Sequence, residues 1–203
     1  MQPIPAIRAP APQRALGRAL APDLGTRLRR DLADFQVRPA LDCEIAAVHG
    51  FAAQLIGEGI VTAEDLQRVH HLTGENGLFV TEEEDQITGV LAFVLLNVRG
   101  LRAVLTGTFD ALSPCADHVA SATAPACAFY GWGVAATTKR SARRVVNGAQ
   151  AIMAGCVAHL PKFAHPTTEA GHRLMRERLG FVDLPDCQQG LVWQAPLEQA
   201  AAA

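Results

Sequence analysis

The sequence predicts an α/β domain of the α+β type, in which helices cover both faces of a sheet. Two observations support this class. Between Cys127 and Leu160 the apolar residues change from a continuous run to a three-and-four spacing, which predicts a buried strand followed by a helix. Along the chain the expected order is strand, two helices, antiparallel meander, strand, helix, strand, helix and two strands, and this order builds a sheet covered by helices.

The chain of 203 residues is long enough for one domain with a sizeable core. Residues 1–32 are rich in Pro, Ala and Arg and are expected to form a flexible or helical extension, with a short helix near Asp23–Ala33. A mitochondrial presequence has a similar composition, but the early prolines would interrupt an amphipathic helix. The domain is predicted for residues 33–196, and residues 197–203 are expected to be a frayed tail.

The first half of the domain is expected to place a strand and two helices before a meander. Thr62 and Asp65 follow a pattern close to a capping box, which marks the start of the second helix. The expected elements are a strand over 35–39, a helix from Asp42 to Leu55, a helix over 62–72, strands Leu78–Thr81 and Ile87–Asn97 joined by a polar turn, and a strand Leu101–Thr108 that follows a turn at Arg99-Gly100.

The second half is expected to hold the central strand and its helix. Thr167 or Thr168 can cap a later helix, which Gly180 ends. The expected elements are an irregular insertion over Ser113–Pro125, a strand over 127–136, a turn Thr137–Ser141, a helix Ala142–Leu160, a strand Phe163–His165, a helix Glu169–Arg178 and two closing strands, Phe181–Leu184 and Leu191–Ala195.

A cluster of cations, Lys139, Arg140, Arg143 and Arg144, lies at the start of the long helix. Positive charge is normally favoured at the other end of a helix, and no acidic residue is near in sequence. Backbone N–H groups and cationic side chains together favour an anion site over a solvated basic face. Because an α/β sheet binds ligands where a central strand passes into a helix, we expect the ligand at residues 137–144.

Composition excludes several other classes. The net charge of −2 argues against nucleic acid as a partner, and a contact through the cationic cluster alone is a weaker alternative. Five cysteines lack metal-binding spacing, so no metal is expected and a reducing cytoplasm is favoured. The longest apolar run, Gly89–Val98, is too short to cross a bilayer, and the acidic run 82–85 is expected to be a solvated hairpin tip.

Two segments resemble the GNAT superfamily of N-acetyltransferases. The segment HPTTEAGHRLMRERLGF is similar to the C-terminal signature of that superfamily, in which a short helix ends in a Leu-Gly-Phe turn, here Leu179-Gly180-Phe181. The segment WGVAATTKRSARRVVNGA resembles its acyl-CoA-binding strand, turn and helix. The order of elements matches from about Phe35 to Ala195. The resemblance therefore implies a GNAT-like sheet that is mixed, mostly antiparallel and flanked by helices.

The resemblance implies that acetyl-CoA or another acyl-CoA is the cosubstrate and that an amine attacks its thioester directly, without a metal. The acyl-CoA would lie in a V-shaped split between strands 131–137 and 163–165. The acceptor is a small-molecule or protein amine, and a homodimer and a carrier-protein donor are left open. The implied cofactor-binding residues are Val134, Ala135 and Ala136 on the strand, Lys139, Arg140, Ser141, Arg143 and Arg144 at the helix start, and Thr168 on the next helix.

Two features depart from the GNAT pattern. The phosphate-binding turn of that superfamily carries glycines, whereas residues 139–144 contain none, and this shifts phosphate binding toward side chains. A tyrosine that protonates the thiolate often stands four residues before the glycine of the Leu-Gly-Phe turn, and here this position is Arg176. Arg176 does not act as a proton donor, but its charge can stabilise a thiolate, so it is a candidate catalytic residue.

The remaining candidates are polar residues near the expected acceptor side. Asp110 and His118 flank the insertion and are candidate catalytic bases, with a turn-capping and a surface role as the alternatives. Tyr130 and Trp132 alternate on one strand and share a face, so they are candidate substrate-binding residues, with core packing as the alternative. Weaker candidates near the cleft are His165 and His172.

The predicted function is that of an acyl-CoA-dependent N-acyltransferase, an N-acetyltransferase in particular. The alternative is a GNAT-like regulatory module that binds acyl-CoA without turnover, because the glycines and the tyrosine of the superfamily pattern are absent. Turnover with a panel of amines separates these two functions.

Overall fold

A computed structural model describes residues 24–57, 59–74, 76–121, 124–184 and 190–197, and these residues form one seven-stranded sheet in the order β1-β2-β3-β4-β5-β7-β6. Neighbouring strands are antiparallel except for the parallel pair β4 and β5. The predicted mixed, mostly antiparallel sheet is therefore confirmed. The strands are β1 (Arg38–Pro39), β2 (Leu78–Glu83), β3 (Gln86–Leu96), β4 (Ala128–Ala136), β5 (Lys162–Ala164), β6 (Val182–Asp183) and β7 (Val192–Gln194).

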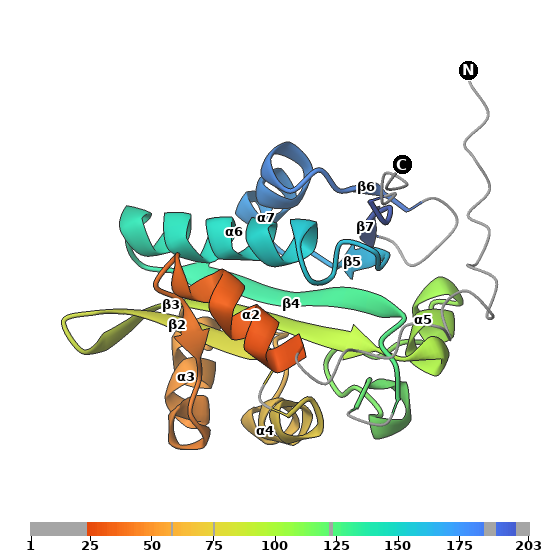
Figure 1. Cartoon of the computed structure of the whole chain (residues 1–203), viewed down its shortest axis with the longest axis horizontal. Coiled ribbons are helices and arrows are strands. Elements are labelled where there is room, and N and C mark those ends of the chain that lie inside the picture. Colours follow the sequence, from red (N-terminus) through yellow and green to blue (C-terminus); the bar gives the residue numbers. More distant parts are fainter. Residues whose placement is uncertain (1–23, 58, 75, 122–123, 185–189, 198–203) are drawn as a thin grey trace.

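Helices cover both faces of the sheet, as Figure 1 shows. Helices α2, α6 and α7 lie on one face, and α3 and α4 lie on the other. None of the described helices is long and apolar enough to cross a membrane. The helices are α2 (Leu24–Ala33), α3 (Ile45–Ile56), α4 (Ala63–Leu72), α5 (Val98–Leu105), α6 (Lys139–Ala154) and α7 (Glu169–Arg173), which continues as a π-helix over Leu174–Arg178.

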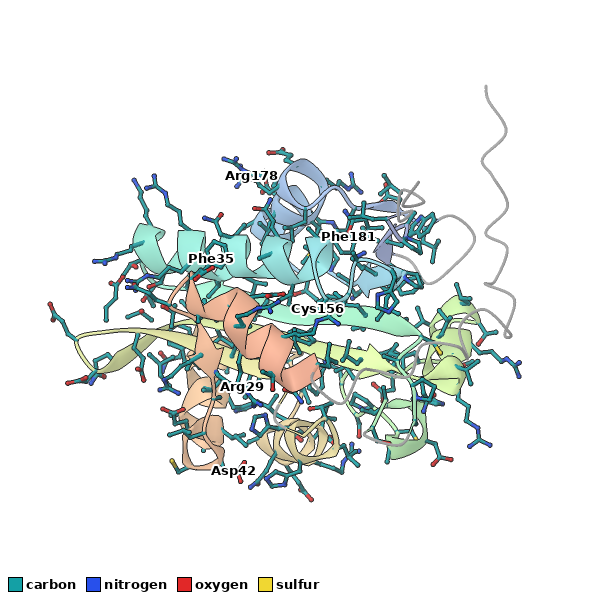
Figure 2. The ribbon with its side chains drawn as sticks, in the orientation of Figure 1. Arg29, Phe35, Asp42, Cys156, Arg178 and Phe181 are labelled. Atoms are coloured by element: carbon teal, nitrogen blue, oxygen red, sulfur yellow. The ribbon has the colours of Figure 1, made fainter. Side chains whose placement is uncertain are left out.

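The alternation of β3 divides the core between the two faces of the sheet. Leu91 and Phe93 pack under α2 and α6, whereas Val90 and Ala92 pack against α3 and α4. Phe93 stacks between Phe79 and Phe129, with ring centroids 5.7 and 4.8 Å apart. Figure 2 labels further members of the two layers: Cys156 and Phe181 belong to the α6 layer, and Asp42 lies beside α3 and α4.

One predicted strand is wrong. Leu101–Thr108 was expected to be extended, but residues 98–105 form α5. The Asn97 side chain caps this helix, because its Oδ1 accepts the N–H groups of Arg99 at 2.9 Å and Gly100 at 3.1 Å. Gly100, read as part of a turn, lies inside the helix against the His118 carbonyl, where a Cβ atom would come within 2.3 Å of the oxygen. Burial of Leu101 and Val104 follows helical spacing.

Other boundaries move by several residues. Helix α6 begins at Lys139, not Ala142, and ends at Ala154, after which turns lead to β5. The first predicted strand shortens to β1, because Gln36 has a φ of 56° that extended backbone does not adopt. Expected extension residues 1–23 and tail residues 198–203 lie outside the described residues. The expected short helix is α2, which buries Leu24, Leu28 and Leu32 in the core.

Candidate active site

The central feature of the site is the point where β4 and β5 separate. The two strands pair only from Phe129 opposite Lys162 to Gly131 opposite Ala164, while β4 continues to Ala136. A crevice opens beyond that last pair, between β4 and the segment that leads into α7. It is lined by Ile56, Gly131, Trp132, Gly133, Val134, Ala164, His165, Pro166, Thr167, Thr168, Gly171, Leu174 and Met175.

A β-bulge coincides with this separation. Adjacent residues Ala92 and Phe93 of β3 face Gly133 and Gly131 of β4, so that Trp132 is the extra residue. The bulge shifts which side chains point to each face. Before it, Phe129 packs on the α6 face; beyond it, Val134, five residues later, also packs on that face. Without the bulge, strict alternation would place these two side chains on opposite faces.

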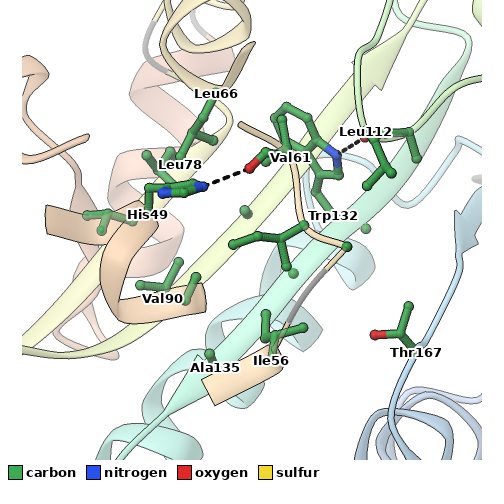
Figure 3. Close-up of a pocket in the computed structure, with 18 of the residues that line it drawn as sticks. His49, Ile56, Val61, Leu66, Leu78, Val90, Leu112, Trp132, Ala135 and Thr167 are labelled. Carbon is green, nitrogen blue, oxygen red and sulfur yellow. Dashed lines mark hydrogen bonds between the residues drawn. The ribbon is translucent and has the colours of Figure 1, made fainter. Parts of the chain in front are cut away.

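A second pocket of about 120 Å³ lies on the α3 and α4 face of the sheet (Figure 3). It shares Ile56, Gly131, Trp132, Gly133, His165 and Thr167 with the crevice, so the two spaces meet at the bulge. Its other lining residues are Val48, His49, Ala52, Gly59, Ile60, Val61, Leu66, Leu78, Val90, Ala92, Ala111, Leu112, Tyr130 and Ala135.

Tyr130 and Trp132 both line this pocket, so the prediction that they share a face is confirmed. The indole Nε1 of Trp132 donates to the Ala111 carbonyl at 2.6 Å. This bond holds the loop that follows α5 against the pocket. Tyr130 is 4 % exposed and its ring lies 5.0 Å from that of Phe109. Burial raises the pKa of Tyr130 to about 12, so its hydroxyl keeps its proton at neutral pH.

Two histidines reach the pocket from different elements. His49 extends from α3, and its Nε2 lies 2.9 Å from the carbonyl oxygen of Val61 (Figure 3). His165 follows β5 and lines both the pocket and the crevice. The sequence patterns indicated His165 only as a weaker candidate and did not indicate His49. The helical spacing of His49 to the buried residues Ile45 and Val48 was the available signal.

The start of α6 is capped from within the chain. Thr138 Oγ1 accepts the N–H of Ser141 at 3.0 Å, and the Thr138 carbonyl accepts the N–H of Ala142 at 2.9 Å. Within the described chain, the N–H groups of Lys139 and Arg140 are those of the first turn that make no such bond. Within the expected ligand site at residues 137–144, backbone donors for a phosphate are therefore limited to the first two residues of the helix.

The Ser141 side chain is also engaged. Its residue is fully buried, and its Oγ lies 2.7 Å from Thr88 Oγ1 and 3.3 Å from Glu83 Oε1. Gly89 makes this packing close, since a Cβ there would come within 2.6 Å of Thr81 and 3.4 Å of Ser141. Ser141 thus fastens α6 to the β2–β3 hairpin, and its hydroxyl does not face the crevice.

Glu83 neutralises part of the cationic cluster. Its carboxylate lies 3.6 Å from Arg144 and 4.0 Å from Arg140, and it accepts from Thr138 Oγ1 at 3.5 Å. The acidic hairpin tip was expected to be only solvated, and for Glu83 this expectation is wrong. The tip lies against α6 because β2 and β3 run beneath the start of that helix. Glu83 and Ser141 are 58 residues apart in the sequence, so local sequence patterns did not predict their contact.

The four cations have different surroundings. Arg144 is 13 % exposed and donates to Thr81 Oγ1 at 3.4 Å, to the Glu82 carbonyl at 3.3 Å and to Gln36. Lys139, Arg140 and Arg143 are exposed. All four line an open basic pocket of about 460 Å³ together with Asp34, Phe35, Gln36 and Asn147.

The predicted catalytic residues do not meet at the crevice. The Asp110 carboxylate accepts the N–H groups of Leu112 and Ser113 at 2.8 and 3.2 Å, as a turn-capping residue does. His118 lies beside Phe109 near the opposite end of β4. Arg176 forms an exposed 2.6 Å ion pair with Asp183. Their catalytic roles stay predictions that this geometry does not favour.

The predicted cofactor-binding residues lie closer together. Val134 and Thr168 line the crevice, and Ala135 lines the apolar pocket. Ala136 packs at the edge of the α6 core. Thr168 caps α7 by accepting the Gly171 N–H at 3.0 Å, which confirms its predicted capping role. Among the described residues no group of three or more His, Cys, Asp and Glu side chains is placed to hold a metal.

No family model matches the sequence, and no curated protein matches it. Solved structures do: a GNAT family acetyltransferase from Brucella melitensis in complex with acetyl-CoA is 15 % identical with a TM-score of 0.44, covering 78 % of this chain and 86 % of that chain.

An N-acetyltransferase from Staphylococcus aureus Mu50 is 10 % identical with a TM-score of 0.47, covering 78 % of this chain and 99 % of that one. The GNAT-like decarboxylase GphF in complex with isobutyryl-CoA is 13 % identical with a TM-score of 0.42, covering 73 % and 80 %.

Proposed function

We propose that this protein is a divergent member of the GNAT superfamily and catalyses acyl transfer from an acyl-CoA to an amine. The observation that carries the proposal is the separation of β4 from β5 at a bulge, which opens a crevice between the sheet and the capped start of α7. Extended backbone that has lost its strand neighbour offers N–H and C=O groups to an extended ligand. The pantetheine arm of CoA carries amides that suit such backbone.

Different residues would bind different parts of the acyl-CoA. Backbone groups of Val134 and Ala136 would pair with the pantetheine arm. The pyrophosphate and the 3′-phosphate would bind the exposed side chains of Lys139, Arg140 and Arg143, with the N–H groups at the α6 start adding two donors. Because residues 139–144 contain no glycine, phosphate binding in this arrangement depends mainly on side chains.

In the proposed reaction the amine nitrogen attacks the thioester carbonyl, the C–N bond forms, and the C–S bond breaks to release the CoA thiolate. His165 borders both spaces and is placed to accept the proton that the amine loses. The Tyr130 hydroxyl, which is protonated at neutral pH, would donate a hydrogen bond to the thiolate or the oxyanion. A proton returned from His165 to the thiolate completes the balance.

Calorimetric titration with CoA and acetyl-CoA tests donor binding. We expect binding by wild-type protein that weakens about tenfold in Arg143→Ala, because one exposed cation to phosphate is removed. Arg102→Ala, an exposed arginine on α5, is the matched control and should bind as wild type does. Absence of binding by wild-type protein at millimolar concentration would contradict the proposal.

A regulatory module without turnover is a second candidate. One observation favours it: the predicted catalytic residues Asp110, His118 and Arg176 do not meet at the crevice. A screen of amines with acetyl-CoA separates the candidates. Amide formation that falls at least a hundredfold in His165→Ala supports the enzyme, whereas tight CoA binding without turnover for any amine supports the module.

A further inference from the structure

The apolar pocket beside the crevice has a lining that selects against charge. None of the described residues that line it is Asp, Glu, Lys or Arg. A charged group transferred into such surroundings would lose its hydration without gaining a partner of opposite charge, which is strongly unfavourable. Polyamines and other multiply charged acceptors therefore do not suit this pocket.

Two of the polar rings in the lining, those of Trp132 and His49, are already hydrogen-bonded to the protein backbone. The indole Nε1 of Trp132 donates to the Ala111 carbonyl at 2.6 Å, and His49 Nε2 lies 2.9 Å from the Val61 carbonyl oxygen. In Figure 3 these two bonds lie at the side of the pocket, with Leu66, Leu78, Val90 and Ile56 around it. A ligand in the pocket thus meets mainly ring faces and aliphatic side chains.

The pocket communicates with the crevice past two glycines. A Cβ atom at Gly131 would lie 3.5 Å from the Ala164 Cβ, and one at Gly133 would lie 3.7 Å from the Ile56 Cδ1. Side chains at these positions would therefore fill the space between β4 and its neighbours. With glycine at both, a group bound in the crevice can extend into the pocket.

The volume sets the size of the group. An apolar cavity of roughly 150 Å³ holds one benzene molecule, which has six non-hydrogen atoms. By the same packing, about 120 Å³ suits about five non-hydrogen atoms. A two-carbon acetyl group would leave most of this space empty.

From these observations we infer that the pocket takes an uncharged apolar group of about five non-hydrogen atoms, larger than acetyl. This inference rests on the proposed function, because the group is carried either by the acyl chain of the donor or by the side chain of the amine acceptor. A branched or linear aliphatic group with four to six carbons has the matching chemistry.

The test compares acyl-CoA thioesters by calorimetry: acetyl-, isobutyryl-, isovaleryl- and hexanoyl-CoA, with free CoA as the reference. Each buried methylene contributes about fourfold in affinity. We expect isovaleryl-CoA to bind at least tenfold more tightly than acetyl-CoA. Ala92→Leu, on the pocket wall, should remove this gain, and Ala46→Leu, on the exposed side of α3, should keep it.

A second variant and two further measurements complete the test. If Ala92→Leu does not fold, Leu112→Trp fills the pocket from its exposed rim. KM values for ethylamine and isoamylamine, with acetyl-CoA as donor, show whether the gain belongs to the acceptor. Binding of isovaleramide without CoA, followed by ligand-observed NMR, probes the pocket independently of the donor.

The inference is supported if the larger thioester binds more tightly, or the larger amine has a lower KM, and Ala92→Leu removes that difference. The series that shows the difference identifies whether the donor or the acceptor carries the apolar group. If CoA binds but neither series gains and isovaleramide does not bind, the inference is overturned while the proposed function stands. If no thioester binds but isovaleramide binds wild-type protein and not Ala92→Leu, the pocket is as inferred and the proposed function fails.

Discussion

The apolar pocket and the cationic start of α6 lie on opposite faces of the same sheet, and they differ in how much of their chemistry the protein already uses. At the start of α6, Glu83 neutralises part of the positive charge and accepts a hydrogen bond from Ser141. Thr138 accepts two of the N–H groups of the first turn. In the pocket, Trp132 and His49 are hydrogen-bonded to backbone carbonyls, but the apolar volume is not filled. A conspicuous charge cluster can thus be partly structural, while an inconspicuous apolar strand borders a ligand space.

Loss of the bulged residue should have the largest effect. Trp132→Ala is expected to lower the free energy of unfolding by about 3 kcal/mol, because this ring packs against the clusters on both sides of the pocket. Urea unfolding measures the change. Trp132→Phe keeps most of the packing and should recover more than half of the loss; a variant Trp132→Ala as stable as wild type would show that the pocket does not depend on this ring.

The two neighbouring arginines of α6 should separate stability from ligand binding. Arg144→Ala is expected to cost about 2 kcal/mol of unfolding free energy, since its largely buried guanidinium bonds Thr81, Glu82 and Gln36. Arg143→Ala should change stability by less than about 0.5 kcal/mol and act on CoA affinity instead. Equal stability of the two variants would contradict a stabilising role for the hydrogen bonds of Arg144.

Lys162 offers a comparison with a buried charge that lines neither region. It is fully buried on β5, its Nζ donates to the carbonyls of Ala158 and Leu160, and desolvation lowers its pKa to about 8. Between pH 8 and its ordinary pKa of 10.5 the unfolded chain binds the extra proton. Stability contributed by Lys162 is therefore present at high pH and is lost as the pH falls through 8.

Measuring unfolding free energy against pH for wild-type protein and Lys162→Met isolates this effect. The difference, wild type minus variant, should rise by up to about 1.4 kcal/mol per pH unit above pH 8. Burial raises the pKa of Cys156 to about 11 and works in the opposite direction, but it is common to both proteins and cancels. A difference that stays constant between pH 7 and 10 would exclude a shifted Lys162.

The smallest effect is expected at the hairpin tip. Glu83→Gln keeps an acceptor for Ser141 but removes the negative charge beside Arg140 and Arg144. We expect CoA to bind about three- to fivefold more tightly, with a steeper dependence on salt. Gln86, at the start of β3, allows the matched control Gln86→Asn, which should leave CoA affinity unchanged. Weaker CoA binding in Glu83→Gln would show that Glu83 organises the phosphate site.

Much of the fold could be predicted from local patterns. The caps at Thr62 and Thr168 and the end of the last helix at Gly180, with a φ of 72°, require only neighbours in sequence. The failure at residues 101–108 came from reading Arg99-Gly100 as a turn, although Asn97 supplies a helix cap. In a short apolar segment, strand and helix periodicities are hard to separate, and packing decides.

By itself the sequence determined the class of fold, the order of most elements and the place of the cationic cluster, because propensity, capping and periodicity act over a few residues. Only the tertiary structure decided which charges stay available. Glu83 meets Ser141 across 58 residues, and His49, Tyr130 and His165 come together from α3, β4 and the segment after β5. The first contact depends on the pairing of β2 with β3 beneath α6, and the second on the pairing of β4 with β5 and on the bulge in β4. None of these pairings has a signal within a short stretch of chain.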